Sequence, residues 1–548
     1  MANNKTIAAI ESQGLVSQII LLLVFSIGVL RNIHLPGLFF DAVNPDYLAA
    51  KILAGNTYIS HFPPWDNFPI LGNYYHGQMH TYFGLVFFKI FGFSVFSLRI
   101  AQAIFGFGIL LISNSILSKI TGSRVLSLAI ISLLALDPAF IFAFRTQNYI
   151  TLSPLLFLLI SLYLLLLIRD KHGKSDHGGM HRVMLVISGV LTGWAFYGYF
   201  IYIFFLPAFI AINIFIARKS GQPAFKMVLY WLAGFALGAV LYLLGYARLW
   251  QELGGFSEIL RGVDGLNMAG NPFEFFQRPY YLLIYTVWSL SGDFHYSAIF
   301  KSTLPTAHGV VKFILMVSIN LIAFVALAVR KRLQTSLGFI LLLIMSFFVV
   351  SLFFAGRIGP HHMIPMLPFL YITLGASLHQ AGSYYLKGGT ELSGRIASAS
   401  LISLVLFLAF LNLQQQNIFQ KQLVETGGVE YYSDSQTLLA EEAKHDPDPP
   451  YYVFGEWGFI GSFALLTAGK IPYNPVLDEW AIGQVPCSTD LAILFWGLTN
   501  PLIESFADTQ GHVINRKIYY QRDGAVSFTA LRVSDRTNCS LSDTYPDY

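Results

Sequence analysis

The sequence has few charged residues for its length. Only 12% of its 548 residues are Asp, Glu, Lys or Arg, whereas 55% are hydrophobic. Soluble proteins average roughly 25% charged residues. A soluble globule cannot cover so much apolar surface with so few charges, so the composition indicates a protein that has lipid as part of its solvent. The net charge of +4 is small and gives no support to a nucleic-acid partner.

Charge is almost absent from a series of long apolar runs. A helix that crosses roughly 30 Å of hydrocarbon needs about 20 apolar residues. The runs that approach this length are 12–30, 100–118, 125–144, 146–168, 183–217, 227–247, 313–329, 333–356, 358–386 and 396–420. The run 183–217 is too long for one span, and Gly198 offers a turn that divides it into two. The sequence therefore predicts an all-α membrane domain of about eleven transmembrane helices.

The basic residues of the short loops predict the orientation. If 76–92 lies against the outer face as a surface helix, every short basic loop falls on one side of the membrane. Basic loops face the cytoplasm, so we expect a cytoplasmic N-terminus and an extracytoplasmic C-terminal segment. The loops 31–99 and 248–312 then face outward, and we expect a multi-pass protein of the plasma (inner) membrane.

The C-terminal part of the chain loses the apolar pattern. Residues 415–548 contain the turn cluster DPDPP at 446–450 and the strand-like runs YYVFG at 451–455 and AVSFTALRV at 525–533. Helix-like segments at 458–468 and 489–506 alternate with these runs. We therefore expect a soluble extracytoplasmic α/β domain at 415–548, after a transmembrane catalytic domain at 1–414.

Cysteine is also scarce. The chain has two cysteines, Cys487 and Cys539, and both fall in the expected outer domain. An oxidising compartment allows a disulfide between them. The sequence alone leaves two interpretations open, a disulfide or two unrelated buried thiols.

The predicted spans contain almost no ionisable residues. Transporters usually carry such residues near the bilayer midplane, but the one carboxylate inside a run is Asp137, near the outer end of its helix. Ionisable and polar residues instead gather on the expected outer face: Asp41, Asp46, His61, Asp66, His76, His80, Arg145, Asn148, Asp293, His295, Arg357, His361 and His362. This distribution predicts a site at the outer membrane–water boundary.

The first outer loop contains a short surface helix beside two carboxylates. In PGLFFDAVNPDYLAAKILAG at 36–55, Asn44 is suited to the N-cap and Gly55 to the end of the helix. About ten residues are too few to cross a bilayer. Asp41 lies just before this helix and Asp46 at its start. Taken alone, both carboxylates fit ordinary solvated loop and cap positions.

The next stretch of this loop, together with the acidic segment, resembles a family. HGQMHTYFGLVFFKIFGFSVFSLRI at 76–100 is similar to the corresponding segment of GT-C glycosyltransferases. This class contains the protein O-mannosyltransferases (glycosyltransferase family 39) and the lipid A aminoarabinose transferases. The resemblance extends through residue 220, and GRIGPHHMIPMLPFLY at 356–371 resembles a late outer loop of the family.

The resemblance implies the activity and several roles. These enzymes transfer a sugar from a polyprenyl-phosphate carrier to a protein, lipid or glycan acceptor on the outer face, usually with inversion. Asp41 corresponds best to the family's catalytic acidic position, where a carboxylate accepts the acceptor's proton. Ala42 stands where many members have Glu, so Asp46 is the candidate second carboxylate. Candidates for binding the substrate, through its phosphate, are Arg145, Arg357, His361 and His362.

The sequence gives weaker evidence about His76, His80 and metal binding. His76 and His80 have a helical spacing that can bind zinc, but no Glu and no third ligand accompany them, which favours packing near the surface. His76 is kept as a substrate-binding candidate. Metal-binding family members often have a further acid in the next outer loop, which here reads FRTQNY at 144–149. A divalent metal is therefore left open, and a lipid-linked glycan polymerase, flippase or other membrane transporter is the alternative function.

Overall fold

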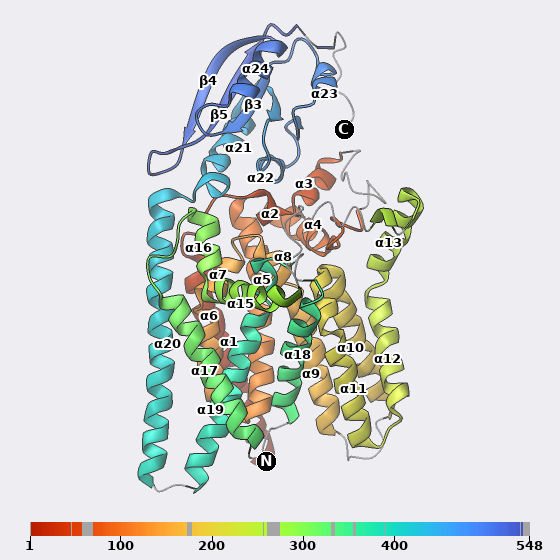
Figure 1. The fold of residues 1–548 in the computed structure, drawn as a ribbon, viewed down its shortest axis with the longest axis vertical. Helices are drawn as coiled ribbons and strands as arrows, with labels where there is room; N and C mark the ends of the chain where they lie inside the picture. Colours follow the sequence, from red (N-terminus) through yellow and green to blue (C-terminus); the bar gives the residue numbers. More distant parts are fainter. Residues whose placement is uncertain are drawn as a thin grey trace.

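The structure is a computed structural model. It describes residues 2–44, 46–56, 69–171, 178–255, 257–259, 275–329, 335–354, 358–388, 391–537 and 539–540. Figure 1 shows a long bundle of helices with the N-terminus at its lower end and an α/β domain beyond its upper end.

Helices form in every apolar run that the sequence singles out. The helices of the bundle and its connections are α1 (Ala2–Leu30), α5 (Val95–Thr121), α6 (Arg124–Ala135), α7 (Pro138–Ala143), α8 (Asn148–Leu152), α9 (Leu155–Lys171), α10 (Gly178–Gly198), η1 (Phe200–Phe205), α11 (Leu206–Ser220), α12 (Ala224–Gly238), α13 (Val240–Leu253), η2 (Phe275–Gln277), α15 (Arg278–Ser291), α16 (Asp293–Phe300), α17 (His308–Val329), α18 (Thr335–Ser351), η4 (Pro360–His362), α19 (Met366–Gly388) and α20 (Glu391–Thr426). The predicted division of 183–217 falls where α10 ends, at Gly198.

The expected number of about eleven crossings is not confirmed. Within the described ranges, five helices are long and apolar enough to span a membrane, and a sixth span results if α12 and α13, bent by 61°, count as one. Several apolar runs are divided into shorter helices. Pro138, for example, begins α7 only three residues after α6 ends at Ala135. The length and apolarity of these helices make the chain an integral membrane protein.

Helices α10 and α12 approach each other through glycines. The glycines are paired four residues apart, Gly189 with Gly193 in α10 and Gly234 with Gly238 in α12. A Cβ atom at Gly189 would lie 2.1 Å from the carbonyl oxygen of Trp231, and one at Gly238 would lie 2.1 Å from that of Val190. Small residues at this spacing allow close packing of membrane helices, so these four positions do not accept a larger side chain.

The loop between α1 and α5, which the sequence places on the outer face, forms α2 (Phe40–Val43), α3 (Tyr47–Ala54) and α4 (Met79–Phe91). Gly55 ends α3 with φ 78°, as the sequence predicts. The prediction that Asn44 is the N-cap is wrong, because α3 begins at Tyr47 with Asp46 at the cap position. At 13 residues α4 is too short to cross a bilayer, and it packs on α3 and α5 at the upper end of the bundle (Figure 1).

The C-terminal region is an α/β unit, as expected. Its elements are η5 (Glu430–Tyr432), α21 (Ser435–His445), β1 (Tyr451–Phe454), α22 (Ile460–Leu466), β2 (Tyr473–Asn474), α23 (Glu479–Gly483), β3 (Leu491–Trp496), α24 (Pro501–Gln510), β4 (His512–Tyr520) and β5 (Val526–Ser534). The strand order is β2-β1-β3-β5-β4, with β1 parallel to β2 and β3 and with β5 antiparallel to β3 and β4. A disulfide joins Cys487 to Cys539, so the first of the two open interpretations is correct.

Two boundaries differ from the expectations. The segment 489–506 is not one helix, because its apolar run Leu491–Trp496 is the central strand β3 and only its end belongs to α24. A short apolar run fits a buried strand as well as a buried helix, which is why periodicity misassigned it. Helix α20 continues past the expected domain start at 415 to Thr426, and the α/β unit follows Gly427 and Gly428.

The α/β domain packs directly on the loop between α1 and α5. Helix α22 contacts both α2 and α3. One apolar cluster combines loop residues such as Leu38 and Val43 with Leu439 of α21 and Phe463 of α22. The α/β domain therefore fixes the position of the loop that carries the two candidate carboxylates.

Candidate functional site

Asp41 is a shielded carboxylate at the start of α2. The aromatic residues just before it, Phe39 and Phe40, pack against Trp457 of the α/β domain with ring centroids 4.9 and 5.5 Å apart. Among the described residues, the Asp41 side chain has no hydrogen bond or ion pair. Loss of solvent without a compensating partner raises the pKa of Asp41 from 3.8 to about 6. A carboxylate with this pKa ionises close to neutral pH and is available to a ligand.

Asp46 has a different environment. It is 3% exposed, and it accepts a hydrogen bond from the hydroxyl of Tyr149. The side chain makes no cap bond to α3. Burial raises the pKa of Asp46 to about 7, and the bond from Tyr149 opposes part of that rise. Asp46 is thus tied to the start of α8, whereas Asp41 has no such bond to the described residues.

Tyr199 connects the two histidine segments. Nδ1 of His362 accepts the backbone N–H of Gly359 at 2.8 Å, so in the neutral ring Nε2 carries the proton and donates to the Tyr199 hydroxyl at 3.0 Å. The ring of His76 stacks on Tyr199 with centroids 6.0 Å apart. Burial raises the pKa of Tyr199, and the nearby Tyr75 and the negative charge of Asp41 raise it further. The fold therefore brings His76 and His362 together on one tyrosine.

His361 lies beside His362 in η4. Their ring centroids are 3.9 Å apart, and the carbonyl of His361 accepts a hydrogen bond from Thr151. Burial lowers the pKa of His361 to about 4 and that of His362 well below 6.5. Both rings are neutral at physiological pH, so neither offers a phosphate a positive charge. The N–H of His362 is already bonded to Tyr199, which leaves His361 as the candidate N–H donor of the pair.

Arg145 is placed elsewhere, with both terminal nitrogens of its guanidinium occupied. Its guanidinium donates to the carbonyls at the end of α1 and just after it: Gly28, Val29, Arg31, Asn32 and Leu35, at 2.6–3.5 Å. The last carbonyls of a helix lack partners within the helix and carry partial negative charge. Arg145 therefore closes the end of α1, and its contacts give no support to the phosphate-binding role expected from the sequence. Arg357 lies outside the described residues.

Several polar groups near Asp46 have no protein partner. His80 is 2% exposed, and neither ring nitrogen has a hydrogen bond within the described part of the chain. Its ring meets that of Tyr149 edge-on, with centroids 5.1 Å apart. Oε1 of Gln102 is likewise buried and unpaired, while its Nε2 donates to the carbonyl of Ala42 at 3.3 Å. Buried polar groups are normally paired, so these atoms mark a place where a ligand or water completes the bonding.

The sequence reasoning missed Tyr149, Tyr199 and Lys51. The two tyrosines carry no local signal, because they lie in aromatic apolar stretches and gain meaning only from their distant partners. Lys51 did carry a local signal, because it is the single cation of the helix YLAAKILA. It is 6% exposed, and burial lowers its pKa to about 8. In the described ranges, no three His, Cys, Asp or Glu side chains gather as a metal site, so no divalent metal is assigned.

Solved structures share this architecture. The apo structure of ArnT from Cupriavidus metallidurans aligns with a TM-score of 0.59 and 12% identity, over 95% of this chain and 98% of that chain. ArnT bound to undecaprenyl phosphate aligns with a TM-score of 0.53 and 12% identity, over 94% and 97%. The oligosaccharyltransferase AglB from Archaeoglobus fulgidus, in complex with an inhibitory peptide and a dolichol-phosphate, has a TM-score of 0.48 and 14% identity, over 87% and 66%.

The chain thus has the fold of the GT-C membrane glycosyltransferases, as its sequence resemblance implied. At 12% identity the likeness to ArnT, which covers 95% of this chain, establishes the fold. No protein-family model and no curated protein sequence matches the chain significantly.

Proposed function

We propose that this protein is a glycosyltransferase that moves a sugar from a polyprenyl-phosphate donor to an acceptor on the outer face of the membrane. The observation that carries the proposal is Asp41, a shielded carboxylate without a protein partner among the described residues, whose pKa is about 6. It sits in the first outer loop of a fold shared with ArnT, which has been solved with undecaprenyl phosphate.

Asp41 is the general base of the proposed reaction. Its carboxylate takes the proton of the acceptor hydroxyl as that oxygen bonds to the anomeric carbon of the donor sugar. The bond between the anomeric carbon and the phosphate oxygen breaks, its electron pair stays on the phosphate, and polyprenyl phosphate leaves. A pKa near the working pH suits this role, because the base is ionised yet still basic enough to accept a proton.

Other residues of the site orient the donor. The neutral rings of His361 and His362 are close enough to each other to contact one group, and Tyr199 holds His362 in place. Lys51 is a buried cation of the same loop and is the candidate to balance the negative phosphate. Asp46, held by Tyr149, is the second carboxylate of the site and does not act as the base.

The decisive experiment measures release of polyprenyl phosphate. The purified protein in nanodiscs is incubated with a panel of polyprenyl-phosphate sugars and with candidate protein, lipid and glycan acceptors. Asp41→Asn keeps the side-chain shape and removes the base, so turnover should fall by ~10²–10⁴-fold. Asp46→Asn is the matched control and should lose much less.

Two outcomes would contradict the proposal. Full activity of Asp41→Asn with an inactive Asp46→Asn would move the base to the other carboxylate. A parent protein that carries the lipid-linked sugar across the bilayer unchanged, without freeing polyprenyl phosphate, would support the transporter alternative.

The proposed orientation has its own test. A cysteine at Asp523, in the exposed turn between β4 and β5, should react with an impermeant thiol reagent on intact cells. A cysteine at Gln222, between α11 and α12, should react only after permeabilisation. The native cysteines do not interfere, because they form a disulfide. The reverse pattern would place the outer domain in the cytoplasm.

A further inference from the structure

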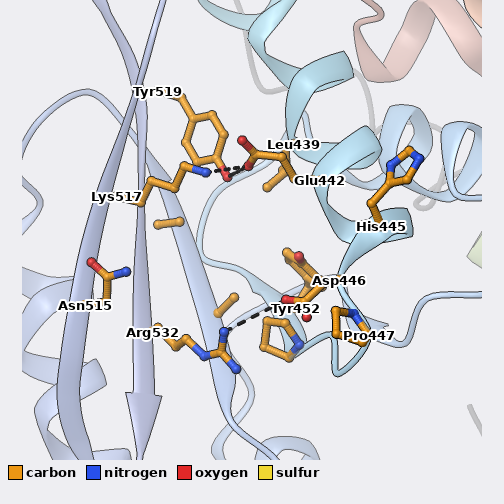
Figure 2. Close-up of a pocket in the computed structure, with 13 residues that line it drawn as sticks. Leu439, Glu442, His445, Asp446, Pro447, Tyr452, Asn515, Lys517, Tyr519 and Arg532 are labelled. Atoms are coloured by element: carbon orange, nitrogen blue, oxygen red, sulfur yellow. Dashed lines mark hydrogen bonds and ion pairs between the residues drawn. The ribbon is translucent and has the colours of Figure 1, made fainter.

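A groove on the α/β domain lies between the sheet and α21. Its volume is about 540 Å³, within the range of roughly 300–1,000 Å³ that is usual for small-molecule sites. Figure 2 shows side chains of α21 and of the turn after it on one side of the groove, and side chains of β4 and β5 on the other. None of these residues belongs to the site around Asp41.

The floor of the groove is a row of residues across the sheet. Asn515 of β4 pairs with Arg532 of β5, which pairs with Ala492 of β3, which pairs with Tyr452 of β1. Paired residues of adjacent strands point to the same face of a sheet. Ala492 and the neighbouring floor residue Ala530 have only a methyl side chain. These small residues leave the space that the groove occupies.

The charges of the groove are matched within the protein. Glu442 of α21 accepts from Lys517 at 2.7 Å and from the Tyr519 hydroxyl at 2.6 Å. Arg532 donates to Asp490 at 2.7 Å and lies 3.9 Å from Asp446 (Figure 2). A phosphate or carboxylate ligand would have to compete with these carboxylates for each cation. The lining therefore does not select an anion.

The same lining suits hydroxyl groups. A hydroxyl both donates and accepts, so it can bond to an ion pair without separating it. Asn515 offers an amide donor and an amide acceptor, and no hydrogen bond to other described residues engages its side chain. Pro447 and Pro450, with Tyr452, provide apolar wall surface for the carbon faces of a ring. Burial raises the pKa of Tyr452 to about 12, so its hydroxyl stays neutral.

We propose that this groove is a binding site for an uncharged carbohydrate. Helix α21 contacts α22, and α22 contacts α2, which carries Asp41. If the protein is the transferase proposed above, the groove holds the glycan part of an acceptor or product. The binding itself does not depend on that activity, so it must also occur in the Asp41→Asn protein, and the two proposals can fail separately.

The test is binding of neutral di- and trisaccharides of glucose, galactose, mannose and N-acetylglucosamine to the full-length protein. Saturation-transfer NMR detects such binding, and nanodiscs avoid sugar-headed detergents that would compete. Ala530→Leu fills the floor of the groove and should abolish the saturation-transfer signal of the saccharide. Asn515→Ala removes one or two hydrogen bonds and should weaken binding about three- to tenfold.

Arg516→Gln is the matched control. Arg516 alternates with Asn515 and Lys517 on β4, points to the opposite face and pairs with Glu504 at 2.8 Å. Its loss should leave sugar binding unchanged, and melting temperatures show that each variant is folded. A saturation-transfer signal that persists in Ala530→Leu would overturn the proposal. So would a parent protein that binds none of the saccharides, or one that binds only sugar phosphates or peptides.

Discussion

The ammonium group of Lys312 in α17 lies 2.7 Å from the carboxylate of Asp137, and these side chains are 1% and 0% exposed. The same carboxylate accepts the hydroxyl of Tyr371 in α19 at 2.6 Å and caps α7 through the N–H of Ala139 at 2.9 Å. Asp137 is the lone acid that the sequence placed inside an apolar run. The structure gives it a partner and makes it a junction between α7, α17 and α19.

Removing one member of this pair should destabilise the protein strongly. Lys312→Met leaves Asp137 buried without a counter-charge, and such changes cost about 3–5 kcal/mol. Adding Asp137→Asn should restore much of the stability, because Asn is neutral, its Oδ1 can still accept from Ala139, and its Nδ2–H can donate to the Tyr371 hydroxyl. Thermal melting of detergent-purified variants measures both effects. The control is Glu430→Gln, in an exposed pair with Lys301, which should change little; equal losses in both pairs would contradict the expectation.

Arg145 should behave as a structural residue. Arg145→Met leaves the buried carbonyls at the end of α1 without their donor, at a cost of about 1–3 kcal/mol for each group left unpaired. We therefore expect a lower melting temperature but an unchanged KM for the lipid-linked donor in the protein that remains folded. Normal melting combined with a large rise in donor KM would instead support the phosphate-binding role expected from the sequence.

The transfer rate should depend on the ionisation of Asp41. Burial raises its pKa to about 6, and only the ionised form accepts a proton. The rate should therefore be high above pH 7 and fall as the pH drops through about 6. A pH–rate profile with a saturating donor measures this, and the residual rate of Asp41→Asn should lack that limb. A parent rate that is constant down to pH 4.5 would exclude Asp41 as the base.

Asp46 should make stability depend on pH. Its pKa is raised from 3.8 to about 7 in the folded protein, so between these values the folded state holds a proton that the unfolded state releases. Stability is therefore full below pH 4 and declines as the pH rises through about 7, by at most roughly 4 kcal/mol from this group. Asp46→Asn, which keeps an acceptor for Tyr149, should flatten the decline. Melting curves from pH 4 to 8 for parent and variant test this, and parallel curves would count against it.

Local patterns in the sequence were sufficient for the positions of the helices. Apolar runs, the division at Gly198 and the end of α3 at Gly55 all follow from residues within a few positions of one another. The same holds for a soluble α/β domain at the C-terminus. Local patterns failed where two structures satisfy them equally, as for the apolar strand Leu491–Trp496. They also failed to show that Asp46, at the cap position of α3, bonds to the distant Tyr149 and makes no cap bond.

The sequence by itself determined a membrane protein with a GT-C-like arrangement and two carboxylates in its first loop, because composition and short motifs carry that information. Only the tertiary structure decided which candidates meet. His362 reaches Tyr199 across 163 positions, while Arg145 is drawn 110 or more positions back to the end of α1. A side chain's role depends on the groups that compete for its hydrogen bonds after burial, and those groups come from distant parts of the chain.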